Sequence, residues 1–326
     1  MLDIRSRTDE APRVSAALDV LTQVFPVYLL ILAGAGARRI GVVKSGHDDA
    51  VLHVVFHVMY PCFILDKILG SESVREFSSV AWGLGIGFAL TVSGFGIAWL
   101  AAAALRYQRG NGKRTFMVGS GVQNFGYTAI PVVEGMWAGT GALAMLFVHN
   151  LGVELAIWSV GVMLISGDKK VPWKRLVNGP VIAVILGLTL VALDLDRSFT
   201  GPPREAMKWL GAGAFPLAIF VTGAVIMELI GKEKPTWRAS LGGCVVRLAL
   251  IPVAMLTVAK FLPLPVVLKQ VIIVQAAMPA AMTPILLAKV YGGRPAVAVE
   301  IVVATTVVSL VTLPFVLLIG RTWLGM

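Results

Sequence analysis

The chain has 326 residues, of which 57% are hydrophobic and 14% are charged, and its formal net charge is +10. Soluble domains carry about 25% charged residues, so this composition excludes an ordinary soluble protein. Apolar runs of about 20 residues recur along the chain, and each is long enough to cross a bilayer as a helix. The runs are continuous rather than alternating, which argues against a transmembrane barrel. The sequence therefore predicts an all-α polytopic membrane protein.

Ten spans are predicted, after a polar segment at residues 1–17 that lacks the features of a secretory signal peptide. The spans lie at approximately 18–38, 48–69, 78–105, 114–136, 141–166, 177–195, 205–230, 237–262, 266–290 and 297–321. A charged linker at 167–176, expected on the cytoplasmic side, separates a first group of five spans (18–166) from a second (177–326).

Most Lys and Arg residues lie in the short connections between these spans, where they set orientation and contact lipid headgroups. We therefore expect membrane lipid, and no nucleic acid, among the partners. The connections opposite both termini carry more Lys and Arg than those on the terminal side. This bias predicts a multi-pass protein of a bacterial cytoplasmic (inner) membrane with both termini outside the cytoplasm.

Proline positions indicate an internal repeat. Proline occurs in the first, second and fourth span of each group: Pro26, Pro61 and Pro131, then Pro180, Pro216 and Pro279 with Pro284. An odd number of spans per group places the two groups in opposite orientations, so the expected architecture is a 5+5 inverted repeat. Because proline is frequent in membrane helices, chance matching is the alternative interpretation.

The fourth and ninth spans look interrupted. Residues 119–131 and 275–289 combine proline, small residues and carboxamide side chains within apolar sequence. Proline removes one N–H group and displaces the carbonyl one turn earlier, and such groups are tolerated in lipid only when protein or a cavity surrounds them. Two interrupted spans in corresponding positions are typical of a transporter's substrate site.

Unwinding at these prolines would leave half-helix N-termini whose free N–H groups attract a carboxylate. The candidate substrate-binding residues donate or accept hydrogen bonds there or break the helix: Gln123, Asn124, Tyr127, Thr128, Pro131, Gln275, Pro279, Thr283 and Pro284. The alternative is two kinked helices whose carboxamides only bond to neighbouring helices.

Ionisable residues deep in spans are costly, so they are candidates for ion coupling or for structural ion pairs: His53, His57, His149, Glu154 and Arg247. His53 and His57 share a helix face, but no carboxylate accompanies them at ligand spacing, so no metal site is predicted. A proton-coupling or packing role suits them better. Arg247 could balance an anionic substrate or pair with a buried carboxylate. No cofactor is expected, and Na⁺ and H⁺ both stay open as the coupling ion.

The sequence contains no H-E-x-x-H, G-x-S-x-G, Walker A or aspartate-rich prenyl-transfer motif. No catalytic residue is assigned, and the chain is not predicted to be an enzyme. A membrane sensor or interaction subunit that does not transport, and an intramembrane enzyme, are the alternatives to a transporter.

Two strings resemble the auxin efflux carrier family: Asn124-x6-Pro131 in the fourth span, and Met278-Pro279-x4-Pro284-x4-Lys289-x-Tyr291 in the ninth. The likeness extends over nearly the whole chain through Pro61, Asn178-Gly179-Pro180, Phe215-Pro216-Leu217, Arg247-Leu248, Pro252 and Pro314.

The resemblance implies ten spans in a 5+5 inverted repeat, similar to the bile acid:sodium symporter fold. Spans 1, 2, 6 and 7 would form a scaffold, and spans 3–5 and 8–10 a transport domain. Spans 4 and 9 would cross at their prolines beside the substrate, and a homodimer through the scaffold is a further expectation. Bacterial members move small organic anions such as malonate or malate. The function predicted is therefore a secondary transporter of a small mono- or dicarboxylate that works by elevator-type alternating access.

Overall fold

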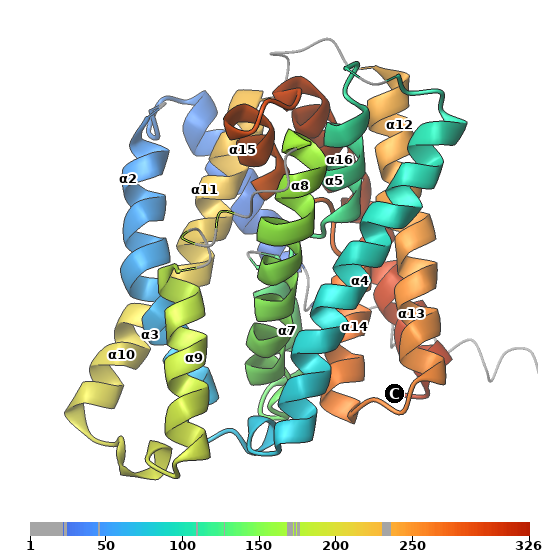
Figure 1. The fold of residues 1–326 in the computed structure, drawn as a ribbon. Coiled ribbons are helices and arrows are strands. Elements are labelled where there is room, and N and C mark those ends of the chain that lie inside the picture. The colour runs from blue at the N-terminus through green and yellow to red at the C-terminus, as the bar shows by residue number, and fades with distance from the viewer. Residues whose placement is uncertain are drawn as a thin grey trace, which may run out of the picture.

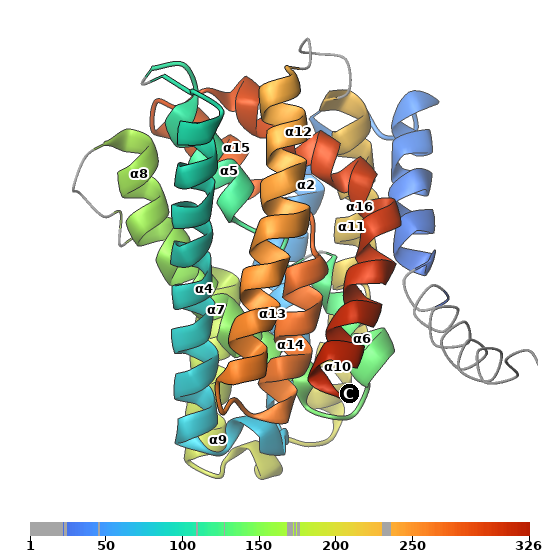
Figure 2. The same ribbon diagram turned by 90° about the vertical axis from the view of Figure 1, so that its right-hand side faces the viewer.

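The computed structural model describes residues 22, 25–44, 46–108, 110–126, 128–167, 172, 174, 177–229 and 236–326. These residues form an all-helical protein, and the β-structure among them is an isolated bridge between Gln123 and Ala280. Two views of the ribbon show the helices packed side by side in one bundle (Figures 1 and 2). The prediction of an all-α protein is confirmed. The polar tail at 1–17 lies outside the described residues.

The part before the linker begins with a helix at residues 25–39. It continues with α2 (His47–Val54), η1 (Val55–Met59), α3 (Tyr60–Ile68), η2 (Glu72–Val74), α4 (Phe77–Ala104), α5 (Lys113–Gly121), α6 (Ala129–Trp137), α7 (Ala142–Ala156), η3 (Ile157–Gly161) and α8 (Val162–Ser166). Of the linker at 167–176, the structure describes only residues 167, 172 and 174.

The part after the linker contains α9 (Gly179–Ala192), η5 (Asp196–Ser198), α10 (Pro202–Ala212), α11 (Ala214–Leu229), α12 (Trp237–Val245), η6 (Val246–Leu250), α13 (Ile251–Phe261), α14 (Val266–Ala277), α15 (Thr283–Val290) and α16 (Pro295–Leu324). Among the described residues, six helical stretches are long and apolar enough to cross a membrane: Ala50–Ile68, Phe77–Ala104, Ala142–Ser166, Pro202–Glu228, Trp237–Phe261 and Pro295–Leu324. Two shorter apolar helices are Gly179–Ala192 and Val266–Ala277.

Two π-helical turns, η1 and η6, explain how long helices continue past a proline. Pro61 follows η1, and Pro252 follows η6 in the same relation. Each proline displaces the carbonyl four residues earlier, and in both helices that carbonyl belongs to the π-helical turn. The wider turn accommodates the displaced carbonyl, so the helix continues instead of ending.

Helices α4 and α7 pack closely against each other at glycine residues. A Cβ atom added at Gly87 would lie 2.1 Å from the carbonyl oxygen of His149, and one added at Gly152 would lie 2.0 Å from that of Leu84. Gly83, one turn before Gly87, faces the α7 side chains of Met145 and Val148, which would lie 2.8 and 3.0 Å from an added Cβ atom, whereas Gly85 faces open space. The two helix backbones can approach this closely only because these positions carry no side chain.

Gly87→Ala should therefore destabilise the protein, because the new methyl group must push α7 away or distort it. Overpacking of this kind costs about 1–3 kcal/mol. Gly85→Ala, on the open face of the same helix, is the matched control and should gain up to ~1 kcal/mol from helix propensity. The measurement is thermal unfolding of the purified protein in detergent, and equal melting temperatures for the two variants would contradict the assigned contact.

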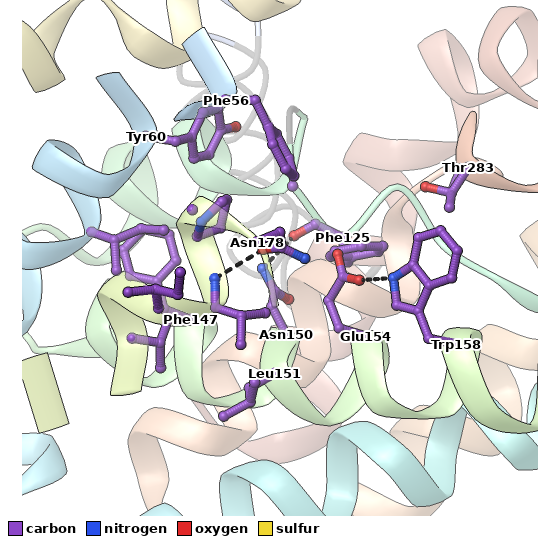
Figure 3. Close-up of a pocket in the computed structure, with 18 of the residues that line it drawn as sticks. Phe56, Tyr60, Phe125, Phe147, Asn150, Leu151, Glu154, Trp158, Asn178 and Thr283 are labelled. Atoms are coloured by element: carbon purple, nitrogen blue, oxygen red, sulfur yellow. Dashed lines mark hydrogen bonds between the residues drawn. The ribbon is translucent and has the colours of Figure 1, made fainter. Parts of the chain in front are cut away.

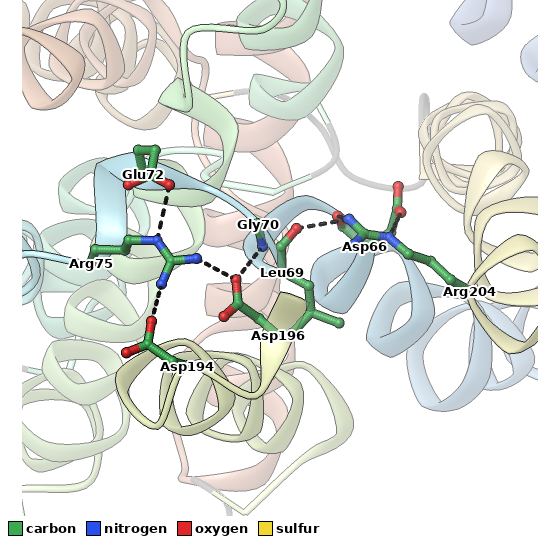
Figure 4. Close-up of polar contacts among 8 residues, drawn as sticks. All are labelled: Asp66, Leu69, Gly70, Glu72, Arg75, Asp194, Asp196 and Arg204. Carbon is green, nitrogen blue, oxygen red and sulfur yellow. Dashed lines mark hydrogen bonds and ion pairs between the residues drawn. The ribbon is translucent and has the colours of Figure 1, made fainter. Parts of the chain in front are cut away.

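A polar cluster fastens the connection before α4 to the end of α9 (Figure 4). Arg75 reaches Glu72 at 3.0 Å, Asp194 at 2.9 Å and Asp196 at 2.7 Å. Asp196 also accepts the backbone N–H of Gly70 at 3.0 Å. The Asp196 side chain is fully buried, whereas 76% of the Asp194 side chain is exposed. Arg75 is thus the counter-charge of a buried carboxylate.

Arg204 completes this end of the molecule from α10. Its guanidinium donates to the carbonyl oxygens of Leu69, at 2.8 Å, and Asp66, at 3.3 Å. These carbonyls end α3 and have no partner inside the helix, so an arginine satisfies them. The two arginines together hold the loop that joins α3 to α4 against α9 and α10.

Asp196→Asn should lower the melting temperature more than Asp194→Asn. Both substitutions remove one charge beside Arg75, but only Asp196 is buried, and exposed ion pairs contribute little. Thermal unfolding in detergent measures the difference. A larger loss for Asp194→Asn would show that burial does not decide the importance of these contacts.

Candidate functional site

Two helices are interrupted near the middle of the bundle. The first break, at residues 122–128, separates α5 from α6, and the second, at residues 278–282, separates α14 from α15. Both lie within the spans that the sequence predicts to be broken. Pro279 lies in the second break, and Pro284 lies in the first turn of α15. Pro131 lies in the first turn of α6, so the first break precedes this proline instead of being centred on it. A proline fits there because first-turn N–H groups have no helical acceptor.

The two breaks bond to each other. The backbone N–H of Asn124 donates to the carbonyl of Pro279 at 2.7 Å, and the N–H of Ala281 donates to that of Val122 at 3.0 Å. These bonds form the antiparallel bridge between Gln123 and Ala280. Unwound backbone in a membrane must find such partners, so each break is tolerated because the other lies against it. We call this pair of unwound segments, 122–128 and 278–282, the crossover.

Neighbouring helices satisfy further backbone groups in the second break and in the last turn of α14 before it. Thr305 of α16 accepts the N–H of Ala280 through Oγ1 at 3.1 Å. The guanidinium of Arg247, from η6, donates to the carbonyls of Gln275 at 3.3 Å and Ala276 at 3.4 Å. A cation at the C-terminal end of α14 also opposes the negative end of its dipole.

A cavity of about 800 Å³ lies beside the crossover. Its walls come from η1, α3, the first break, α7 with η3, the start of α9 and the start of α15 (Figure 3). Aliphatic side chains and five aromatic rings make up most of the lining, and the aromatic residues are Phe56, Tyr60, Phe125, Phe147 and Trp158. An apolar cavity with a few directed polar groups is the usual form of a small-molecule site.

The polar groups of the cavity are mostly uncharged donors and acceptors. Asn150 donates to the carbonyl of Phe125 at 2.8 Å and accepts from Gln275 at 3.0 Å. Four residues further along α7, Glu154 accepts from the indole N–H of Trp158 at 2.5 Å. Asn150, Glu154 and Trp158 therefore form one stripe of the helix that faces the cavity (Figure 3).

The start of α15 also borders the cavity. Met282 and Thr283 belong to its lining, and their backbone N–H groups have no hydrogen-bond acceptor among the described residues. Free N–H groups at a helix N-terminus carry partial positive charge and favour an anion.

The predicted substrate-binding residues divide into two groups. Asn124 and Thr283 line the cavity, with Asn124 donating to Thr128 Oγ1 at 3.2 Å. The remaining described residues form or flank the crossover behind the cavity wall: Gln123, Thr128, Pro131, Gln275, Pro279 and Pro284. Tyr127 lies outside the described residues. The crossover thus brings the two predicted strings together, and whether they bind substrate stays a prediction.

The five deep ionisable residues are dispersed. His57 and Glu154 line the cavity, and the ring of His53 lies 4.1 Å from that of His57. His149 and Arg247 are fully buried and do not line it. In the described part of the chain, no three His, Cys, Asp or Glu residues are grouped to hold a metal ion.

Sequence reasoning missed Asn150 and Thr305. A carboxamide in an apolar span, four residues before Glu154, could have been recognised as a second polar group on one helix face. Thr305 could not, because a threonine that bonds to its own helix is common in membrane spans, and nothing local marks its contact with Ala280.

Thr305→Val should destabilise the crossover, because valine keeps the shape but leaves the buried N–H of Ala280 without an acceptor. Such a loss costs about 1–3 kcal/mol. Thr306→Val, one position along α16, is the control and should melt near the wild-type temperature. Thermal unfolding in detergent gives the comparison, and an unchanged melting temperature for Thr305→Val would exclude a structural role for this bond.

Comparisons with known proteins show the family of the chain. An uncharacterised transporter of Methanocaldococcus jannaschii is 22% identical over 277 residues, which cover 82% of this chain and 88% of that protein. A profile of the family described as membrane transport protein matches residues 19–170 and 163–317. The chain therefore belongs to this membrane transport protein family, the auxin efflux carrier family that its interrupted spans resemble.

Proposed function

We propose that the protein is a secondary transporter that moves a small organic anion, a mono- or dicarboxylate, across the cytoplasmic membrane. The observation that carries this proposal is the pairing of two interrupted helices at the wall of a cavity of about 800 Å³. Such breaks near the middle of a bundle are how transporters expose backbone groups to a substrate.

Neutral donors and helix dipoles suit the binding of a carboxylate. The free N–H groups at the start of α15 would donate hydrogen bonds to one carboxylate oxygen of the substrate. The side-chain amide of Asn124 would donate a hydrogen bond to the other oxygen. A carboxylate bound by dipoles can be released again on the far side of the membrane, because no buried ion pair has to be broken.

The lining favours an acid with an apolar body. Five aromatic rings border the cavity, whereas His57 and Lys174 are the basic residues among the described lining. A second carboxylate group would have to leave water with little positive charge to receive it. We therefore expect an apolar monocarboxylate to bind more tightly than a dicarboxylate of similar size.

The arrangement of helices supports elevator-type movement within a ten-span, 5+5 inverted repeat. The scaffold would comprise the helix at 25–39, α2–α3 and α9–α11, which lie together on one side of Figure 1. The transport domain would comprise α4–α8 and α12–α16, which extend from the middle of that view to its right side. Both groups contribute to the cavity wall, so sliding one against the other would expose the site alternately to each membrane face. The proposal includes termini outside the cytoplasm and a homodimer through the scaffold.

Asn124→Ala should lower saturable uptake of radiolabelled carboxylate into proteoliposomes by about tenfold or more, because loss of a hydrogen bond to a charged group costs roughly 1.5–3 kcal/mol. Malonate, malate and indole-acetate are the substrates to compare, with and without a Na⁺ or pH gradient. Asn111→Ala, in the connection before α5, removes the same amide outside the cavity and should transport normally. Unchanged uptake by folded Asn124→Ala protein would exclude this placement of the substrate.

A further inference from the structure

Glu154 is the acidic side chain that lines the cavity in the described part of the chain. It projects from α7 beside Asn150, and the indole of Trp158 donates to one of its oxygens (Figure 3). The cavity proposed to bind a carboxylate substrate therefore also contains the carboxyl group of Glu154. The proposed function does not explain why an acidic side chain lies there.

Among the described residues, no Lys, Arg or His forms an ion pair with Glu154. The other titratable groups that face the cavity are His57, Tyr60 and Lys174. The Nδ1 atom of His57 lies 2.9 Å from the carbonyl oxygen of His53, and the Lys174 side chain is exposed.

The helices packed against this part of α7 supply no further charge near the cavity. The sequences of α4 and α9 contain no ionisable side chain. Glu134 of α6 pairs with Lys67 of α3 at 2.7 Å. Lys269 lies in the first turn of α14 and Lys289 in the last turn of α15, at the ends of these half-helices away from the crossover.

Ionisation of Glu154 in the occupied cavity would therefore be unfavourable for two reasons. A carboxylate held in apolar surroundings by a single hydrogen bond loses most of its hydration without compensation. A second carboxylate in the same cavity adds like-charge repulsion, which protonation of one of the two groups removes. The indole N–H of Trp158 can bond to the protonated form as well, through the carbonyl oxygen of the acid.

We propose that Glu154 is the proton-binding residue of the carrier: it takes up one proton whenever a carboxylate substrate occupies the cavity, and the two cross the membrane together. This inference rests on the proposed function. It identifies H⁺ as the coupling ion and Glu154 as the residue that carries it.

Thermodynamic linkage gives the proposal a quantitative form. If substrate binding requires the protonated carboxyl, the proton and the substrate strengthen each other's binding by the same factor. Apparent substrate affinity should then fall by about tenfold per pH unit once Glu154 ionises in the empty carrier. Glutamine keeps the acceptor for Trp158 and cannot ionise, so it fixes the neutral state.

The test compares wild-type protein with Glu154→Gln and Glu300→Gln in proteoliposomes. Glu300, on α16, accepts from Thr236 outside the cavity and is the matched control. The readouts are counterflow of radiolabelled indole-acetate, malonate and malate over a pH series, and accumulation driven by an inward proton gradient. Melting temperatures establish that each variant is folded.

Wild-type protein and Glu300→Gln should accumulate substrate with the proton gradient, and their counterflow should weaken as the pH rises. Glu154→Gln should exchange substrate at a rate that is independent of pH and that exceeds the wild-type rate at high pH. It should no longer accumulate substrate when an inward proton gradient is applied. Proton-driven accumulation by Glu154→Gln, or accumulation by wild type that follows a Na⁺ gradient and ignores pH, would overturn the assignment.

A second readout uses wild-type protein alone, so it does not depend on how the variant folds. The measurement covers a pH series that extends to values at which Glu154 is ionised in the empty carrier. There, adding a transported carboxylate to weakly buffered, purified protein should raise the pH of the solution by the uptake of about one proton per bound substrate. Binding without proton uptake across the whole series would overturn the proposal for Glu154 and leave the carrier standing. If folded wild-type protein shows no saturable counterflow of any of these acids, the proposed carrier function is refuted. The proton proposal is then refuted with it.

Discussion

A membrane interior offers no water to unpaired backbone groups, and the organisation of this protein follows from how it satisfies that constraint. Two helices stop halfway through the bundle, and each would leave N–H and carbonyl groups without partners. They lie against each other so that Asn124 bonds to Pro279 and Ala281 bonds to Val122. Thr305 and Arg247, from α16 and η6, satisfy groups in the second break and in the last turn of α14 before it. Two unwound segments that lie far apart in the sequence thus satisfy each other's backbone groups through one short antiparallel bridge.

The same arrangement creates the cavity. A continuous helix would present only side chains, whereas the start of α15 presents backbone N–H groups beside aromatic rings and the carboxamide of Asn150. The surrounding helices hold these groups in place through contacts as close as that of Gly87 against the carbonyl of His149. In the proposed mode of binding, helix dipoles rather than a buried cation receive the carboxylate, so one acidic residue, Glu154, would take part in the site when it carries a proton.

Much of this could be read from the sequence, since proline and carboxamides are costly in an apolar span unless the freed polar groups find partners inside the protein. The strings around Asn124 and Pro279 correctly located both breaks. The first break begins before Pro131, because a proline fits the first turn of the following half-helix, where N–H groups have no helical acceptor. The bond from Thr305 to Ala280 could not be predicted, because it depends on the placement of α16 against the crossover. For the same reason the sequence could not separate Glu154, on the cavity wall, from His149, which is buried elsewhere.

The central claim is that a carboxylate binds where the two interrupted helices meet. An experimental structure of the protein with a transported carboxylate bound tests this most directly. We expect density for the acid in the cavity, with its carboxylate against the start of α15 and the side chain of Asn124, and its body among the aromatic rings. Density for the substrate outside this cavity, with the crossover empty, would contradict this claim.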